Sequence, residues 1–445
     1  MKIETEDLQD RQVQLTVEVP ADRIGTAMRS AARRLGSTTR IPGFRPGKVP
    51  YEVLLGRFGE EAVFEEALDA LGQEVYRQAL EDSKLDPIAP GVLNEVVSRD
   101  PLVLRYRVPL PPEIELGKYR KLRLDFKPAE VTDEALEEVL ENLRQRRALI
   151  EPADRPARMG DVLVLDVKGE LEQPDDPKER RLLEEQGVSL LLDPENDWPV
   201  PGIAEQLVGL AAGEQRSLNH TFAEDYVNEP LRGKQAQFHF SCKEVKSRLV
   251  PDWTDDLARG MGDYEGLLDL RLKVRESLKE QAEQEAKEQY ADQAVQALTD
   301  QAQITYPPVL LDQEIHELIE DLERNLRGQK LTLEAYMQAE GKSHEQLHED
   351  FKPRAEKRLR RALVIGKLIE AEDLQVEDQE VQDRIDRLIG TIEDKSGNLR
   401  KALEKPASRH RIGNDLLVEK AVERLSAIAR GEKIPEAQPK VETKE

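Results

Sequence analysis

The stretch that decides the architecture is Gly43-Phe44-Arg45-Pro46-Gly47-Lys48-Val49-Pro50, which lies between two segments with helical patterning, about 21–36 and 50–83. Its prolines stiffen the loop and its glycines allow tight turns, so the loop presents Phe44, Arg45 and Lys48. A phenylalanine set between glycines and basic residues is unsuited to a core. We therefore predict that Phe44 contacts a partner.

The surrounding segment 21–57 is basic in a chain that is otherwise acidic. It holds eight Arg and Lys against two acids, a local balance of 8 minus 2 or +6, whereas the whole chain has 66 minus 90 or -24. A charge run is commonly a solvated helix face, but arginine forks also suit phosphate oxygens. With an apolar residue at its centre, the segment predicts docking on a large anionic partner.

Length and composition limit the class of protein. The 445 residues predict about three folded units, and 35% charged with only 4% aromatic residues favours helix-rich, well-solvated elements. The start of the chain does not resemble a signal peptide, and no apolar run is long enough to span a membrane. Cys242 is the single cysteine, so no internal disulfide forms. We expect a cytosolic protein.

Two strands and two helices predict an α+β domain at the start of the chain. Apolar and polar residues alternate over 11–19 and again over 102–108, as in strands with one buried face. The proline-rich stretch 108–112 indicates a boundary. A helix follows, with Thr132 as its predicted N-cap and an apolar stripe at Leu136, Val139, Leu140 and Leu143.

The remainder divides into a β-rich part and a helical part. Short strand-like runs at 162–165 and 238–242 are separated by Pro and Gly turns up to about 247. Helical patterns dominate from about 251 to 430, and stripes such as the one containing Leu359 and Leu368 are more often mutual packing than a binding surface. The last stretch has little to bury and predicts a disordered tail.

The loop motif resembles the ribosome-binding signature of the trigger factor family. The resemblance implies docking through Gly43, Phe44, Arg45 and Lys48 on a ribosomal protein and ribosomal RNA beside the peptide exit tunnel. Pro46 stands where many members have a basic residue, so one charged contact is missing here. The resemblance to the family extends over nearly the whole chain and implies an elongated, multi-domain α+β protein. The implied parts are a ribosome-binding domain (1–112), a linker helix packing with the C-terminal domain (113–149), an FKBP-type isomerase domain (150–247), a helical domain with two arms (248–432) and a disordered tail (433–445).

The middle domain resembles the FKBP-type prolyl isomerases at 200–203, 209–214 and 222–226. Such a domain needs no nucleophile, because an apolar pocket that binds the twisted amide lowers the barrier to prolyl rotation. The resemblance places the pocket walls at Val167, Val200, Ile203, Tyr226 and Phe238. Members commonly carry phenylalanine at the first and third of these positions, so their replacement predicts weak catalysis. A domain kept for packing or substrate contact, with little turnover, is the alternative.

His344-Glu345-Gln346-Leu347-His348 fits the H-E-x-x-H zinc motif, but it has a simpler explanation. Its flanks are charged and no third ligand is identifiable, whereas Ser343 with Gln346 forms a capping box at a helix start. Trp198 and Trp253 receive no assignment. A zinc protease is therefore the least favoured function.

Together these features predict a cytoplasmic, partly ribosome-bound chaperone that acts on nascent and unfolded chains and isomerises prolyl bonds. No Walker-type loop is present, which indicates action without ATP and without a cofactor. The main alternative is a prolyl isomerase and chaperone without ribosome attachment. The resemblance also leaves a weak homodimer open, and it implies no membrane partner.

Overall fold

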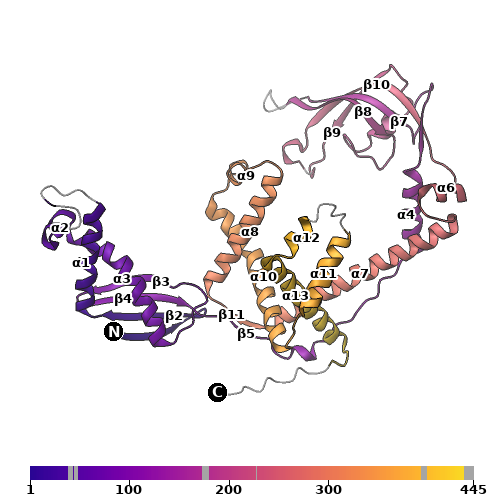
Figure 1. Cartoon of the computed structure of the whole chain (residues 1–445). Coiled ribbons are helices and arrows are strands. Elements are labelled where there is room, and N and C mark those ends of the chain that lie inside the picture. Colours follow the sequence, from indigo (N-terminus) through magenta and orange to yellow (C-terminus); the bar gives the residue numbers. More distant parts are fainter. Residues whose placement is uncertain (39–43, 45–48, 173–179, 227, 392–397, 435–445) are drawn as a thin grey trace. The chain divides into compact units, whose positions relative to one another are not determined.

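The computed structural model describes residues 1–38, 44, 49–172, 180–226, 228–391 and 398–434 (Figure 1). The chain folds into two compact units. One combines Met1–Lys127 with Lys287–Glu445, and the other is Pro128–Ala286. The first unit is thus built from both ends of the chain, and the second is inserted between them.

A four-stranded antiparallel sheet carries the N-terminal part of the first unit, in the order β1-β2-β4-β3. Its elements are β1 (Lys2–Leu8), β2 (Gln12–Val19), β3 (Val92–Arg99) and β4 (Leu102–Pro109), with α1 (Ala21–Thr38), α2 (Tyr51–Phe58) and α3 (Glu60–Ser83). Alternate residues of β2 and β4 are buried against Leu71 and Val75 of α3. This confirms both predicted strands. The outer strands β1 and β3 were not predicted.

The predicted single helix over 50–83 is wrong, because it is two helices. Gly59 separates α2 from α3 with φ 85°, a backbone conformation that favours glycine. The preceding helix was predicted over about 21–36, and α1 (Ala21–Thr38) confirms it.

Helices form the C-terminal part of the first unit. Its elements are β5 (Glu113–Glu115), η1 (Tyr119–Lys121), the second half of α7 (Leu267–Gln301), β11 (Gln303–Thr305), α8 (Pro308–Gly328), α9 (Leu333–Glu340), α10 (His344–Ala371), α11 (Asp378–Thr391), α12 (Asn398–Leu403) and α13 (Pro406–Arg430). β5 pairs with β11, and the core is formed by α7, α10 and α13. Leu359 and Leu368 are buried, which confirms that their stripe serves packing.

A buried carboxylate, Glu372, holds three segments of this unit together. Its side chain is 0% exposed and accepts hydrogen bonds from Tyr119 (2.7 Å), Arg120 (2.6 Å) and Arg424 (3.0 Å). Burial by itself would raise the pKa of Glu372, but these donors outweigh it and hold the pKa below its ordinary value of 4.5. The carboxylate is therefore charged in the folded protein at neutral pH.

The second unit is built around a twisted antiparallel sheet in the order β6-β10-β7-β8, with β9 beside β10. Its elements are α4 (Asp133–Gln145), β6 (Leu149–Pro152), β7 (Val162–Leu171), β8 (Arg181–Leu191), α5 (Ile203–Leu207), β9 (Gln215–Thr221), η3 (Glu229–Leu231), β10 (Gln235–Leu249), α6 (Asp255–Met261) and the first half of α7. One face of the sheet forms a core with α5 and with Cys242, which is buried as a small apolar residue.

The helix predicted after the proline-rich boundary is α4, and it is confined to Asp133–Gln145. Thr132 caps it as predicted, since its hydroxyl accepts a hydrogen bond from the backbone of Ala135. The predicted apolar stripe packs on Leu270 and Val274 of α7. Within the described part of the chain, no helix is long and apolar enough to cross a membrane.

Replacing Glu372 by glutamine should destabilise the first unit by about 3 kcal/mol, because it leaves two partly buried guanidinium groups without their carboxylate. The pKa of Glu372 is lower in the folded protein than in the unfolded chain, so its contribution is fully present above pH 4.5 and is lost as the pH falls through the folded pKa. The difference between wild type and variant should therefore shrink on acidification. Urea unfolding followed by circular dichroism at several pH values measures both effects.

Glu349→Gln is the matched control for this experiment. Glu349 lies on α10, the helix that Glu372 directly follows, and pairs with Lys352, but its side chain is 67% exposed. Exposed pairs contribute at most about 1 kcal/mol, so this variant should unfold close to wild type. Equal urea midpoints for the two variants would contradict the role given to Glu372.

Candidate functional site

The ends of the basic loop are fixed by packing of the helices that flank it. A Cβ at Gly36 of α1 would lie 2.5 Å from the Leu54 side chain, so this glycine lets α2 approach α1 closely. Leu54 is 1% exposed, and Val49 and Tyr51 pack on the same cluster. The chain therefore enters and leaves the loop from a rigid base.

The loop itself lies largely outside the described residues. Phe44 is described and is 41% exposed, in keeping with a residue that packs on no core of its own chain. Gly43, Arg45 and Lys48 fall outside the described residues, and their predicted roles stay predictions. Within this segment, the structure describes the packing at the base of the loop and the exposure of Phe44.

The helices around the loop carry unequal amounts of free positive charge. Arg23 pairs with Glu74 (2.8 Å) and Arg34 with Glu66 (2.5 Å), so α3 neutralises two of the predicted basic residues. Others are exposed and have no ion-pair partner within the described part of the chain, namely Arg29, Arg33 and Arg57. The segment therefore offers fewer unpaired positive charges than its sequence suggested.

A second candidate site is a hollow of about 490 Å³ in the inserted unit, a volume ordinary for a ligand pocket. It opens between β7, β8, β10 and the segment that joins β9 to β10. Most of its lining residues are aliphatic or aromatic; the lining comprises Leu171, Arg181, Leu182, Leu183, Trp198, Pro199, Phe222, Tyr226, Asn228, Pro230, Leu231 and Phe238.

Hydrogen bonds shape the segment that carries Tyr226. The backbone of Phe222 bonds to Lys234 and Gly233, which closes the connection between β9 and β10 at its base. The carbonyl of Tyr226 accepts a hydrogen bond of 2.7 Å from Arg232. The rings of Phe222 and Tyr226 then meet with centroids 4.8 Å apart, forming one wall of the hollow.

The structure separates the five predicted wall residues into two groups. Tyr226 and Phe238 line the hollow. Val167, Val200 and Ile203 belong to the core cluster beneath it and are at most 2% exposed. All five predicted residues thus belong to one packed cluster. Two of them line the hollow, and the other three lie beneath its surface.

Several lining residues were missed from the sequence. Trp198 follows β8 in an irregular segment, and Leu182 and Leu183 begin that strand after a stretch outside the described residues. Nothing in the period-two pattern distinguishes a residue beside a hollow from any other half-buried residue. The one available signal was Trp198 itself, a large ring next to a proline in a chain with few aromatics.

The hollow offers binding without acid–base chemistry. Among the described lining residues the charged one is Arg181, which is exposed and paired with Glu184 at 2.9 Å. His220 packs edge-on to Phe222, and burial lowers its pKa, so its imidazole is neutral at pH 7. An apolar pocket with no nucleophile suits the rotation of an amide bond, which needs only preferential binding of the twisted form.

The histidine motif begins a helix. Ser343 and Gln346 form the predicted capping box at the start of α10. The His348 ring contacts His316 of α8 with centroids 6.2 Å apart. Among the described residues, no three His, Cys, Asp or Glu side chains are arranged to hold a metal ion. The zinc hypothesis therefore rests on the motif alone.

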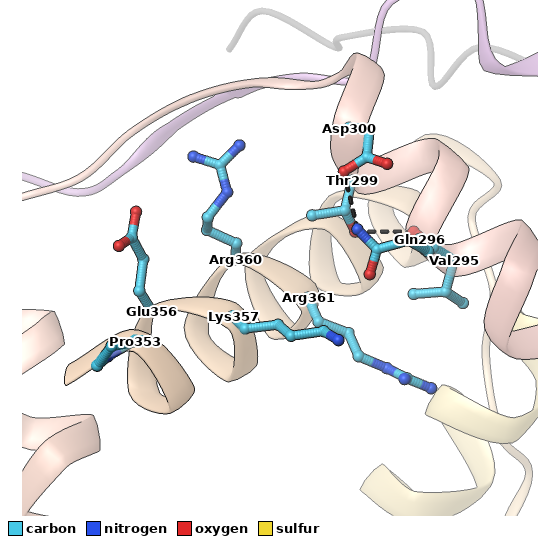
Figure 2. A pocket seen from close by; sticks show the side chains of 9 residues that line it. All are labelled: Val295, Gln296, Thr299, Asp300, Pro353, Glu356, Lys357, Arg360 and Arg361. Atoms are coloured by element: carbon cyan, nitrogen blue, oxygen red, sulfur yellow. Dashed lines mark hydrogen bonds between the residues drawn. The ribbon is translucent and has the colours of Figure 1, made fainter. Parts of the chain in front are cut away.

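A further hollow of about 260 Å³ lies between α7 and α10 in the first unit. Figure 2 shows Gln296, Thr299 and Asp300 on one helix facing Glu356 and Arg360 on the other. Arg361 at its edge pairs with Asp292 of α7 at 2.7 Å. Both signs of charge line this hollow and no aromatic ring does, so it is the weaker candidate for binding an apolar group.

Comparison with known proteins gives a consistent result. The sequence model described as "Bacterial trigger factor protein (TF)" matches residues 1–143, and that of the "Bacterial trigger factor protein (TF) C-terminus" matches 266–427. A trigger factor from Pelotomaculum thermopropionicum is 32% identical over 97% of this chain and 98% of its own length. One from Moorella thermoacetica is 33% identical over 91% and 90%.

The fold comparison agrees with these sequence matches. A solved structure described under "Promiscuous Substrate Recognition in Folding and Assembly Activities of the Trigger Factor Chaperone" has a TM-score of 0.52 at 24% identity. It covers 96% of this chain and 99% of its own. Because the sequence identity is 24%, this structural similarity shows a shared fold and nothing further.

Substituting alanine for Gly169 should disturb the hollow, because a Cβ there would lie 2.7 Å from the Phe238 ring on the neighbouring strand. The ring must shift, at an expected cost of about 1–3 kcal/mol. Near-ultraviolet circular dichroism and urea unfolding measure the two effects. Gly260→Ala in α6 is the control, since apart from the adjoining helix backbone nothing lies within 4 Å of a Cβ there. Unchanged spectra and stability for Gly169→Ala would contradict the described seating of Phe238.

Proposed function

Since the chain belongs to the trigger factor family and is a ribosome-associated chaperone, we propose that it docks at the peptide exit tunnel through the loop at 43–48 and isomerises prolyl bonds in the hollow of its inserted unit. Its clients are nascent and unfolded polypeptides, bound and released without ATP. We place it in the cytoplasm, partly on ribosomes.

The observation that supports docking is the exposed Phe44 at the centre of a basic segment. Leu54 against Gly36 and Val49 on the same cluster support the loop at both ends. An aromatic side chain with neighbouring cations combines apolar burial with attraction to phosphates, as binding hot spots do. Gly43, Arg45 and Lys48 are the proposed companions of Phe44.

The proposed division of labour follows the domains expected from the sequence. Residues 1–112 attach to the ribosome, 150–247 hold the isomerase pocket, and 248–432 form the helical arms that receive clients. Residues 113–149 link the first of these to the arms, and 433–445 form a tail. Tyr226 and Phe238 are the proposed pocket walls, supported from below by Val167, Val200 and Ile203.

Phe44→Ala and Arg45→Ala should each weaken ribosome binding by about tenfold, because each removes a contact of the kind that dominates small interfaces. Cosedimentation with ribosomes at several protein concentrations measures the affinity. Ile88→Ala is the control, since Ile88 is also 41% exposed but lies outside the loop.

Equal pelleting of all three variants would remove the proposed docking site. Pelleting of wild type no greater than a ribosome-free blank would favour the rival function, a prolyl isomerase and chaperone without ribosome attachment. The contribution of Arg45 should also fall as salt concentration rises, whereas that of Phe44 should not.

Tyr226→Ala should lower the kcat/KM of the full chain for a proline-containing peptide by about tenfold, because it removes one aromatic wall of the hollow. A proline isomerisation assay measures the rate. Val208→Ala should leave it unchanged, since Val208 is 38% exposed and does not line the hollow. A wild-type rate equal to the uncatalysed one would indicate a domain kept for packing or substrate contact.

A further inference from the structure

The aromatic lining of the hollow comes only in part from the positions predicted for it. The two positions where the family pattern calls for rings, Val167 and Ile203, are aliphatic and each 1% exposed. Four aromatic residues nevertheless line the hollow, namely Trp198, Phe222, Tyr226 and Phe238. Of these, Trp198 has the largest side chain and lies outside the motifs that indicate the pocket.

The backbone holds Trp198 at the edge of the hollow. Its N–H donates to the Asn196 side chain (3.1 Å), and the same side chain donates to the carbonyl of Leu191 at the end of β8 (3.0 Å). Pro199 follows and restricts the backbone further. The indole is half-buried, because it packs on the core cluster and also lines the hollow. It is thus fixed in place and accessible.

We propose that Trp198 is a wall of the prolyl-binding pocket and replaces the aromatic surface that Val167 and Ile203 do not provide. This inference rests on the proposed isomerase function. An indole offers a large, rigid apolar face against which a pyrrolidine ring excludes water. Leu182, Leu183 and Leu231 at the same hollow suit an aliphatic side chain next to the proline. The occupant is therefore a prolyl residue flanked by an aliphatic residue in an extended polypeptide.

Fluorescence tests this contact directly, because the chain has only two tryptophans. Trp253 packs with α4, α6 and α7 and does not line the hollow. Trp253→Phe therefore leaves Trp198 as the single reporter in the full chain. A tetrapeptide amide containing Leu-Pro should shift its emission in a saturable manner, and the same peptide with alanine for proline should not.

Calorimetry with the same peptide distinguishes failure of the Trp198 assignment from failure of the proposed isomerase function. Binding heat without any change in Trp198 emission would overturn the assignment of Trp198 and leave the isomerase function intact. Absence of binding heat, together with an isomerisation rate equal to the uncatalysed one, would overturn both.

Substitution of Trp198 gives an independent readout. Trp198→Phe should keep kcat/KM within about threefold, whereas Trp198→Leu, which retains apolar bulk without a ring, should lower it by about tenfold, mainly through KM. Val208→Ala again serves as the control. Circular dichroism verifies that each variant is folded. Equal kcat/KM for the phenylalanine and leucine variants would overturn the proposal, since simple packing would then account for Trp198.

Discussion

The buried carboxylate of Glu372 is the contact on which the first unit depends. The chain leaves that unit at Lys127 and returns at Lys287, so its parts must find each other across a long insertion. Loop-closure entropy grows only slowly with the length of the insertion, so a modest set of specific contacts is sufficient. Tyr119 and Arg120 precede the insertion, whereas Glu372 and Arg424 follow it. Because an unpaired buried charge is costly, this cluster favours the arrangement that brings the three segments together.

The position of each strand in its sheet decides how well it could be predicted from the sequence. β2 and β4 are central strands with one buried face, so their apolar residues alternate and both were predicted. β1 and β3 are edge strands of that sheet; charged residues obscure the period of β1, and β3 pairs with β4 through register shifts. The break at Gly59 was missed because the apolar pattern continues through α2 and α3, and only the backbone angle at that glycine shows the turn.

The hollow in the inserted unit was predictable in kind but not in detail. The family resemblance named Tyr226 and Phe238 as pocket walls, and both residues line the hollow. The depth of Val167 and Ile203 depends on how β7 and α5 pack, which no local pattern reveals. Trp198 reaches the hollow through an irregular segment after β8, where neither period two nor period 3.6 applies. Residues that line a hollow are therefore the part of a site that sequence periodicity predicts least.

The charge distribution bears on how such a chaperone can release its partners without ATP. A net charge of -24 opposes approach to ribosomal RNA, whereas the segment around the loop carries the opposite sign. Arg23 and Arg34 pair with acidic residues of α3, so fewer positive charges of this segment remain to bind phosphates. This limits the affinity for an anionic partner. A site built from one exposed aromatic ring and a few cations binds weakly enough to dissociate thermally. In the proposed docking, the basic loop provides the contact with the ribosome. The negative charge of the rest of the chain weakens this binding, so that it stays reversible.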